Sequence, residues 1–331
     1  MMPPGRAGVA PALLLAGCAA ASPPMTTMAP KSDLAAAIRT LFFEIIGLDG
    51  LILTVVLVAL WLGIFRYSRR SGLGTEVSRT AQFRLEAAWT VGPALIILAI
   101  AVPSVRLTFR TQPAVVPRDA LVVQVIARQW WWEARYPGLD LTTANEIHLP
   151  LGRTVRVLLD SADIIHSFWV PQLGGKRDVV PGQTNEIVLV PRVPGTYPGQ
   201  CAEFCGTSHA NMRFRVVVDT PEDFAAWTAR EKAPPVVPAA PAAAAGARLY
   251  AGSTCTPCHA IGPLSAGRFG PDLTHFASRA TFAGGTLANT PENLAAWLRD
   301  PQALKPGAKM PSLGLTEAEV GQLVAYLGSL E

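Results

Sequence analysis

Charged residues are scarce in this sequence: Asp, Glu, Lys and Arg together make up 16% of its 331 residues. Half of the residues are hydrophobic, which is too apolar for an ordinary soluble protein and indicates membrane segments. The formal net charge is only +4, and no basic run concentrates it, so we expect no nucleic acid partner. The length exceeds that of one small domain and accommodates two domains with a membrane anchor.

Cysteine is also scarce, but four of the five cysteines stand in two close pairs. One pair is Cys201 with Cys205, and the other is Cys255 with Cys258. In a reducing compartment such pairs usually indicate metal or redox chemistry, whereas outside the membrane they could form disulfides. The residues around each pair have to decide between these alternatives.

The first 17 residues have the pattern of a lipoprotein-type secretory signal peptide. Arg6 precedes a short apolar core, and small residues follow before Cys18. The end of this segment resembles a bacterial lipoprotein processing site, where the cysteine becomes the lipidated first residue. The alternatives are an unlipidated signal cut nearby or a cysteine of no consequence. We favour lipidation because Cys18 has no other obvious partner. Residues 18–40 would then be extracytoplasmic.

Two long apolar stretches predict a transmembrane helical hairpin over residues 41–110. The stretches cover residues 41–65 and 88–105, and about 20 helical residues suffice to span a bilayer. Pro93 and Pro103 lie near the ends of the second stretch, where a membrane helix tolerates proline.

The loop between these stretches is rich in arginine. Its charged residues are Arg66, Arg69, Arg70, Arg79 and Arg84, against Glu76 and Glu86. The positive-inside rule places this loop in the cytoplasm. Everything after residue 110 is therefore expected on the periplasmic side of a bacterial inner membrane, which the chain crosses twice.

Residues 111–231 are expected to form an all-β domain. Short runs of strand-forming residues alternate with Pro-Gly turns, a pattern typical of an antiparallel sandwich or barrel. The runs cover residues 121–126, 154–159, 185–190 and 213–218.

The loop before the last of these runs brings together side chains that bind soft metals. It holds Cys201, Glu203, Cys205, His209 and Met212. Sulfur ligands together with imidazole select copper, and one cysteine is enough for a mononuclear copper site. Two thiolates can bridge two copper ions, so the pair predicts a dinuclear centre. The alternative is a short-loop disulfide, which would leave the spacing of Glu, His and Met to chance.

A second histidine ligand has to come from elsewhere in this domain, where His148 and His166 remain. We predict His166, because it stands at the end of an expected strand, where a ligand can be presented rigidly. His148 is interpreted as structural.

The spacing Cys-x-Glu-x-Cys-x-x-x-His-x-x-Met resembles the copper A motif of cytochrome oxidase subunit II. The resemblance extends over residues 41–219: residues 163–168 are similar to the family's strand with the first histidine, and residues 176–182 to the loop after it. It implies a cupredoxin-like Greek-key domain. The cysteines would bridge both coppers, each histidine would bind one, and the thioether and one backbone carbonyl would complete the set. The implied copper ligands are His166, Cys201, Glu203, Cys205, His209 and Met212.

The resemblance implies three further roles. The Glu203 carboxylate would reach a magnesium site at the interface with subunit I. Trp130 would be the point where electrons enter, although a tryptophan cluster can also simply pack. Arg128 and Trp131 depart from the family at this place, as an attached electron donor would allow. Glu86 would stand at the entrance of a proton channel in subunit I; the alternative is an interfacial carboxylate at a helix N-terminus.

After a helix expected over residues 221–232, a Pro/Ala linker over residues 232–242 leads to a further domain. Cys255-Thr256-Pro257-Cys258-His259 is the attachment signal of a covalent haem c, with His259 on the iron. Met310 is the expected second axial ligand, and His275 is its competitor. A Met/His pair raises the haem potential, which suits a haem that accepts electrons from another cytochrome c.

Residues 243–331 resemble a small class I cytochrome c, an all-α domain. Thr290 before Pro291 opens one expected helix. Thr316 and Glu319 predict a capping box for the last helix. The fusion to a copper domain points to the caa-type branch of haem–copper oxidases.

The predicted function is that of the electron-input subunit of a terminal respiratory oxidase. Its expected partners are oxidase subunits I and III, cytochrome c as donor, and membrane lipid. The remaining histidines are too few for an oxygen-reducing site, which we assign to subunit I. The alternatives are a nitrous oxide or nitric oxide reductase component and a copper assembly or storage protein. A quinol oxidase subunit would lack the copper ligands that stand here.

Overall fold

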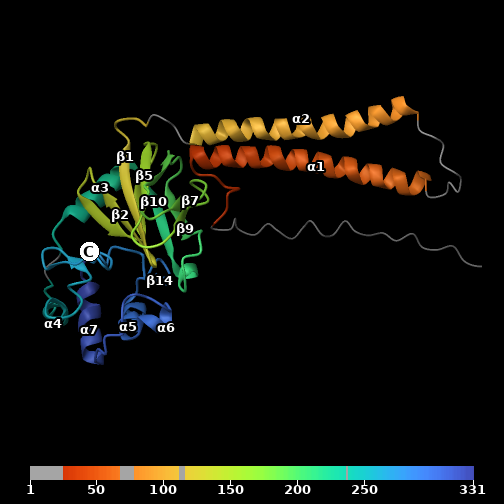
Figure 1. The fold of residues 1–331 in the computed structure, drawn as a ribbon. Helices are drawn as coiled ribbons and strands as arrows, with labels where there is room; N and C mark the ends of the chain where they lie inside the picture. The colour runs from red at the N-terminus through yellow and green to blue at the C-terminus, as the bar shows by residue number, and fades with distance from the viewer. Residues whose placement is uncertain (1–24, 68–77, 112–115, 236–237) are drawn as a thin grey trace, which may run out of the picture.

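The computed structural model describes residues 25–67, 78–111, 116–235 and 238–331. These residues form a helical hairpin, a β-sandwich and a C-terminal helical domain, in chain order (Figure 1). The predicted signal peptide, Cys18 and residues 68–77 of the arginine-rich loop lie outside the described residues.

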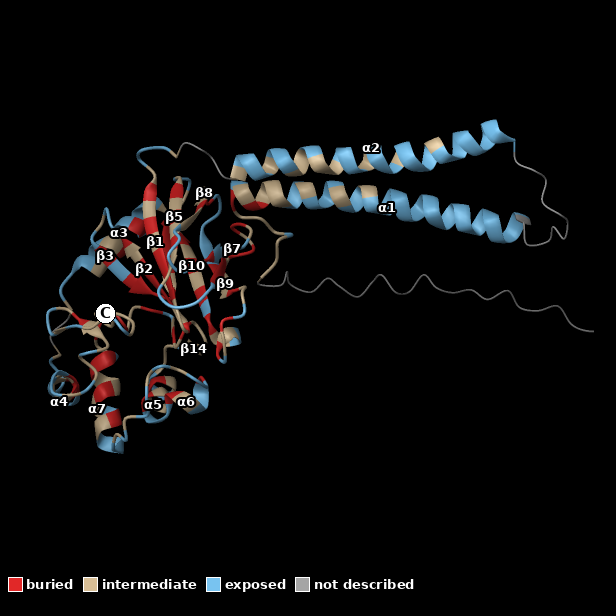
Figure 2. Ribbon diagram, in the orientation of Figure 1, coloured by how far each residue is buried: buried red, intermediate tan, exposed pale blue. Residues whose placement is uncertain are grey.

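The hairpin consists of α1 (Asp33–Tyr67) and α2 (Arg79–Thr111), which run side by side away from the sandwich (Figure 1). Each helix is long and apolar enough to cross a membrane. Their apolar side chains are largely exposed (Figure 2), which is costly in water and fits a lipid environment. The first helix begins at Asp33, before the apolar stretch that starts at residue 41. The Ser32 hydroxyl caps it by accepting from the Ala35 N–H, so the polar residues before the apolar stretch are already helical.

The β-sandwich has two five-stranded sheets, in the orders β3-β2-β1-β5-β8 and β4-β10-β9-β6-β7. Its strands are β1 (Leu121–Arg128), β2 (Trp131–Tyr136), β3 (Leu141–Ala144), β4 (Glu146–Pro150), β5 (Val155–Ser161), β6 (His166–Trp169), β7 (Arg177–Val179), β8 (Asn185–Leu189), β9 (Gly195–Cys201) and β10 (Arg213–Asp219). The four predicted runs lie in β1, β5, β8 and β10.

The pattern predicted an antiparallel sandwich or barrel, and two strand pairs of the sandwich depart from it. β1 pairs with β5, and β4 with β10, in parallel. The physical reason is a crossover: after the β2–β3 hairpin the chain passes to the other sheet as β4, so β5 returns beside β1 in the same direction.

Aromatic rings fill the centre of the sandwich. The Trp132 ring is fully buried, and its centroid lies 5.7 Å from that of Phe168 and 5.1 Å from that of Phe214. Edge and tilted contacts of this kind stabilise a core beyond the area they bury. The third residue of the tryptophan cluster therefore serves packing.

The helix α3 (Pro221–Lys232) follows the last strand and matches the predicted helix. Its Trp227 ring stacks on His148 with centroids 4.3 Å apart. The His148 Nδ1 atom lies 2.7 Å from the Asp219 carboxylate and its Nε2 atom 3.5 Å from that of Glu146. His148 thus joins two strands and a helix, in agreement with a structural role.

The C-terminal domain packs on the end of the sandwich far from the hairpin (Figure 1). It contains α4 (Pro241–Ala251), α5 (Pro291–Arg299), α6 (Pro301–Leu304) and α7 (Glu317–Leu327), with the short ribbons β11 (Ala260–Ile261) with β12 (Ser265–Ala266) and β13 (Thr281–Phe282) with β14 (Leu287–Ala288). The first helix begins at Pro241, inside the predicted linker. The Thr290 cap and the Thr316–Glu319 capping box are both present.

Close helix packing holds this domain together. The helices α4 and α7 cross at Gly246, where an added Cβ atom would lie 2.1 Å from the Gln322 carbonyl oxygen. Only a glycine permits this approach. Tyr250, Leu294 and Leu323 belong to a core that is separate from that of the sandwich.

Candidate metal and cofactor sites

Two thiols, two imidazoles and a thioether meet at the end of the sandwich that carries the C-terminal domain. The Cys201 and Cys205 sulfurs are 3.7 Å apart. The Nδ1 atom of His166 lies 3.9 Å from the Cys201 sulfur, and that of His209 lies 3.4 Å from the Cys205 sulfur. The Met212 sulfur is 3.7 Å from the Cys205 sulfur. The structure therefore brings together the side chains that sequence analysis selected.

The two functional groups of Glu203 face different surroundings. Its backbone carbonyl oxygen lies 3.2 Å from the Cys201 sulfur, at the cluster. Its carboxylate is 43% exposed and lies 3.9 Å from the Lys176 ammonium. The carbonyl can therefore act as a ligand in the cluster, while the carboxylate is free to meet a partner outside it.

Strand register positions the ligands. Phe168 of β6 pairs with Cys201 of β9, so His166 at the start of β6 lies beside the cysteine loop. The Cys201 N–H donates to the Met212 carbonyl at 3.0 Å and closes this loop. The 3₁₀ helix η1 (His209–Asn211) turns the chain back toward β10.

The electrostatics of the two cysteines favour a cation between them. Both are almost fully buried, 2% and 1% exposed. The hydrogen bond between the two sulfurs, followed by the contact with His166, lowers the pKa of the Cys201 thiol, and the same pairing raises the pKa of Cys205. Two adjacent thiolates cannot both be charged without a compensating ion. At 3.7 Å the sulfurs are also too far apart for a disulfide bond of about 2.05 Å.

The donor set fits copper. Thiolate, imidazole and thioether are soft or borderline ligands, and all are present in one buried cluster. The cluster of His166, Cys201 and Cys205 has ligand atoms within 4.8 Å of one another.

Sequence analysis missed Asp163 and Gln129, which orient these ligands, and it missed the contact of Trp130 with Cys205. The Asp163 carboxylate lies 2.8 Å from Nε2 of His166, so it holds the ring with Nδ1 toward the cysteines. The Gln129 side-chain amide and the Trp130 indole N–H both donate to the Cys205 carbonyl, at 3.0 and 2.8 Å. The spacing Asp-x-x-His before a strand could have revealed Asp163.

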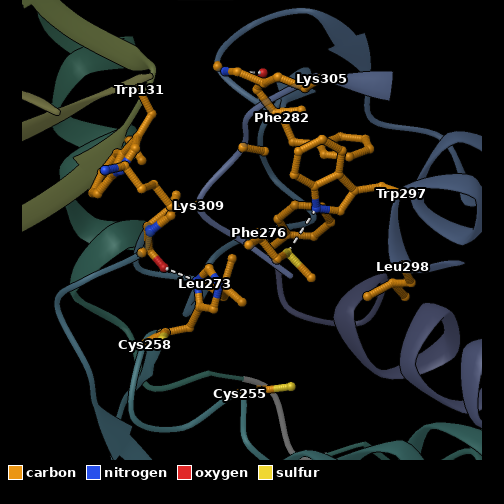
Figure 3. Close-up of a pocket in the computed structure, with 18 of the residues that line it drawn as sticks. Trp131, Cys255, Cys258, Leu273, Phe276, Phe282, Trp297, Leu298, Lys305 and Lys309 are labelled. Carbon is orange, nitrogen blue, oxygen red and sulfur yellow. Dashed lines mark hydrogen bonds between the residues drawn. The ribbon is translucent and has the colours of Figure 1, made fainter. Parts of the chain in front are cut away.

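A largely apolar pocket lies in the C-terminal domain, and Trp130 and Trp131 of the sandwich also line it. Cys255, Cys258, His259 and Met310 all line it, and in Figure 3 the two cysteines lie at the opposite end from Lys305. The Nδ1 atom of His259 donates to the Pro271 carbonyl at 2.8 Å, which leaves Nε2 free as a ligand. Burial lowers the pKa of His259, which favours the neutral imidazole that binds metals.

The sulfur of Met310 faces this pocket, whereas His275 does not line it. The Trp297 indole N–H donates to the Met310 sulfur at 3.2 Å (Figure 3). The Nδ1 atom of His275 lies 2.9 Å from the carbonyl oxygen of Glu331, at the C-terminus. The geometry therefore favours Met310 over its competitor.

Two observations test whether the pocket fits a covalent haem. Arg279, which lines it, is 6% exposed, and its Nε atom has no hydrogen-bond partner among the described residues. A buried guanidinium of this kind fits an anionic group at the rim of an apolar ring. An added Cβ atom at Gly270 would lie 2.5 Å from the His259 ring, so the chain closes on this imidazole through a glycine. The residues that line this pocket therefore fit a covalent haem.

The remaining predicted site residues lie in different places. The Trp130 side chain is 8% exposed and lies under the C-terminal domain. Trp131 lines the pocket of that domain, and the Arg128 guanidinium lies 5.7 Å from the Trp131 ring centroid. Glu86 accepts a hydrogen bond from Gln82 in the part of α2 far from the sandwich, so the structure does not bring it near the other site residues (Figure 1).

Three protein families match parts of this sequence. Residues 20–107 match the cytochrome C oxidase subunit II transmembrane domain, and residues 138–220 match its periplasmic domain. Residues 243–331 match cytochrome c. These ranges coincide with the hairpin, most of the sandwich and the C-terminal domain.

Relatives match nearly the whole chain. The cytochrome c oxidase subunit 2 of Alkalihalophilus pseudofirmus is 34% identical, over 96% of this chain and 94% of its own length. The subunit 2 of Bacillus subtilis is also 34% identical, over 96% of this chain and 95% of its own length. A crystal structure of the periplasmic domain of subunit II of cytochrome oxidase of Bradyrhizobium japonicum is also similar, with 30% identity and a TM-score of 0.34. The match covers 36% of this chain and 97% of the chain in that crystal structure. The chain therefore belongs to the cytochrome c oxidase subunit II family, in the form with a C-terminal cytochrome c domain, and is a membrane-bound electron-input subunit of a haem–copper oxidase.

Proposed function

We propose that electrons enter this subunit at a haem c held by the C-terminal domain and leave it through a dinuclear copper A centre in the sandwich. Cytochrome c would be the donor and subunit I the acceptor, where oxygen is reduced to water and protons are pumped. Covalent attachment of the haem would use Cys255 and Cys258, with His259 and Met310 on the iron. The proposed copper ligands are His166, Cys201, Glu203, Cys205, His209 and Met212.

The observation that carries this proposal is the clustering of four sulfur and imidazole side chains from the loop with His166 from a separate strand. A shared electron in a dinuclear copper centre changes each bond length little, which makes electron transfer fast. The protein contributes rigidity: Asp163 fixes one imidazole, and Gln129 and Trp130 hold the Cys205 backbone. The buried sulfurs exclude water from the cluster.

Further roles belong to the same proposal. The outward-facing Glu203 carboxylate suits a magnesium site shared with subunit I. Glu86 is proposed for the entrance of a proton channel, and Cys18 for lipidation after removal of residues 1–17. We place the hairpin over residues 41–110 in the bacterial inner membrane, with residues 111–231 and 243–331 on the periplasmic side and subunit III as an additional partner.

Electron paramagnetic resonance of the full-length chain tests the copper proposal. The chain would be produced with haem maturation, loaded with copper in detergent and oxidised. We expect the hyperfine pattern of one electron shared equally by two copper nuclei, beside a low-spin haem signal. His209→Gln should abolish the equal sharing, whereas His148→Gln, a histidine of the same domain that lies outside the cluster, should retain it.

Two results would contradict the proposal. One is a single-copper pattern in the unaltered chain. The other is the absence of a copper signal after reduction and careful loading. Either would leave a cytochrome domain attached to a sandwich without a dinuclear centre.

A further inference from the structure

One buried lysine bonds to both the C-terminal domain and the sandwich. Lys305 is 4% exposed. Its ammonium group donates to the Trp130 carbonyl at 2.5 Å and to the Ala283 carbonyl at 2.9 Å. The first carbonyl belongs to the sandwich and the second to the cytochrome domain, so a single group bonds to the backbone of both.

Two other hydrogen bonds surround this contact. The Ser208 hydroxyl donates to the Pro306 carbonyl at 2.5 Å. The Arg213 N–H donates to the Gly284 carbonyl at 2.8 Å. Both join the copper loop or the strand after it to the cytochrome domain, and both, like the bond from Lys305 to Trp130, are accepted by a backbone carbonyl.

Glycines allow the two backbones to come this close. An added Cβ atom at Gly284 would lie 2.3 Å from the Lys305 ammonium nitrogen and 2.7 Å from the Trp130 carbonyl oxygen. An added Cβ atom at Gly307 would lie 3.2 Å from the Trp130 ring. Both glycines have positive φ angles, 73° and 81°, which other residues rarely adopt. The lysine therefore occupies a site shaped around it.

Burial of Lys305 costs free energy that an apolar side chain at the same position would not cost. Burial lowers its pKa to about 7, and no carboxylate pairs with it among the described residues. Methionine or leucine would fill the same space without this cost. The ammonium is retained at a place where it satisfies two backbone carbonyls in a defined geometry.

We propose that Lys305 is a positioning residue that fixes the cytochrome domain on Trp130, and this deepens the proposed function. The Trp130 indole donates to the Cys205 carbonyl of the copper loop, and its ring contacts the segment that leads to Met310. A docked Lys305 therefore keeps Trp130 in contact with both sites. The docked cytochrome domain also covers Trp130. An external cytochrome therefore cannot reach Trp130 and has to deliver its electrons to the haem domain.

Chemical labelling of the unaltered protein tests the docking first. The full-length chain, loaded with haem and copper in detergent, would be treated with an amine-reactive acetylating reagent and analysed by mass spectrometry. Lys309 is exposed and provides the reference within the same segment. We expect Lys305 to react at least tenfold more slowly. An exposed lysine with a lowered pKa would react faster than Lys309, so equal or faster labelling of Lys305 would overturn the proposal.

A substitution tests the role of the ammonium group itself. Lys305→Met replaces the unbranched alkyl part of the side chain with one of similar shape but removes the ammonium group that donates. Arg299→Gln removes one positive charge from an exposed position of the same domain and is the matched control. Amide hydrogen exchange at Arg213 reports docking, because this N–H donates across the interface, and exchange in α7 reports the fold of the domain.

For Lys305→Met we expect at least tenfold faster exchange at Arg213 and slower haem-to-copper electron transfer, with α7 and the haem spectrum unchanged. Arg299→Gln should behave like the unaltered chain. Unchanged exchange and electron transfer in Lys305→Met would overturn the proposal. If that variant fails to fold, as loss of protection in α7 would show, the labelling result decides. The proposed function is judged separately, by the copper spectrum of the unaltered chain, which does not depend on docking.

Discussion

At the scale of single residues, the candidate copper cluster depends on side chains that never touch the metal. Asp163 holds the His166 ring through Nε2, and this contact selects the tautomer that leaves Nδ1 free for the metal. We expect Asp163→Ala to lower copper affinity roughly 10- to 100-fold. Competition with a copper chelator measures this. Asp119→Asn, at an exposed position on the other side of the domain, should leave the affinity unchanged; equal loss in both variants would show a general effect of charge.

His148 illustrates a titrating group with a structural role. Burial disfavours its charged form, but hydrogen bonds to Asp219 and then Glu146 outweigh burial and raise its pKa. The raised pKa means that the folded state binds a proton more tightly than the unfolded state. The stabilisation is therefore complete below the unfolded pKa of about 6.5 and is lost as pH rises through the folded pKa.

Thermal unfolding between pH 5.5 and pH 9, roughly the range where histidine titrates, measures this contribution. We expect His148→Gln to be less stable than the unaltered chain by about 2 kcal/mol at the acid end, since hydrogen bonds to charged groups contribute about this much. The difference should shrink as pH rises. A constant difference across the range would mean that packing against Trp227, and not the proton, supplies the stability.

At the scale of elements, local signals were predictable and pairings were not. The α3 helix and the caps at Thr290 and Thr316 matched the sequence prediction, because a cap uses residues only three positions apart. The candidate ligands of the cysteine loop could also be predicted, since they lie in one segment of the sequence. The parallel pairing of β1 with β5 could not, because it follows from a crossover between sheets.

The contacts of Lys305 could not be predicted from the sequence. Nothing around it indicates a partner 175 positions away in the chain. Its role arises only when two separately folded domains meet. The distant histidine ligand is a contrasting case: the sequence already favoured His166 over His148, and the β6–β9 register places His166 beside the cysteines.

The crossing of α4 and α7 provides a test at this scale. Gly246→Ala would place a methyl group against the Gln322 carbonyl and should destabilise the domain by about 1–3 kcal/mol. Gly321→Ala is the matched control on α7, where an added Cβ meets nothing within 4 Å, and it should stabilise the helix by up to about 1 kcal/mol. Denaturant unfolding followed by haem absorbance measures both. Equal effects would mean that helix propensity, not the close approach, governs this position.

At the scale of the whole molecule, the arrangement of domains decides how an external donor is used. The cytochrome domain lies over Trp130, whose indole N–H donates to the Cys205 carbonyl of the copper loop. The hairpin leaves the opposite end of the sandwich (Figure 1). Because Trp130 is covered, we expect an external donor to deliver its electrons to the proposed haem and not directly through Trp130.

Replacement of the proposed axial methionine tests this expectation. Met310→Leu removes the thioether that faces the pocket, and loss of a Met ligand lowers the haem potential. We expect oxidation of external cytochrome c by the assembled oxidase to fall at least about tenfold, because a shift of about 60 mV already changes a one-electron equilibrium tenfold. The copper spectrum should persist, since its ligands are untouched. Met28→Leu makes the same change at an exposed position outside both sites and should have no effect. If Met310→Leu lowers the haem potential but oxidation continues at the original rate, external donors reach the copper cluster directly, and the cytochrome domain must move away from Trp130 during turnover.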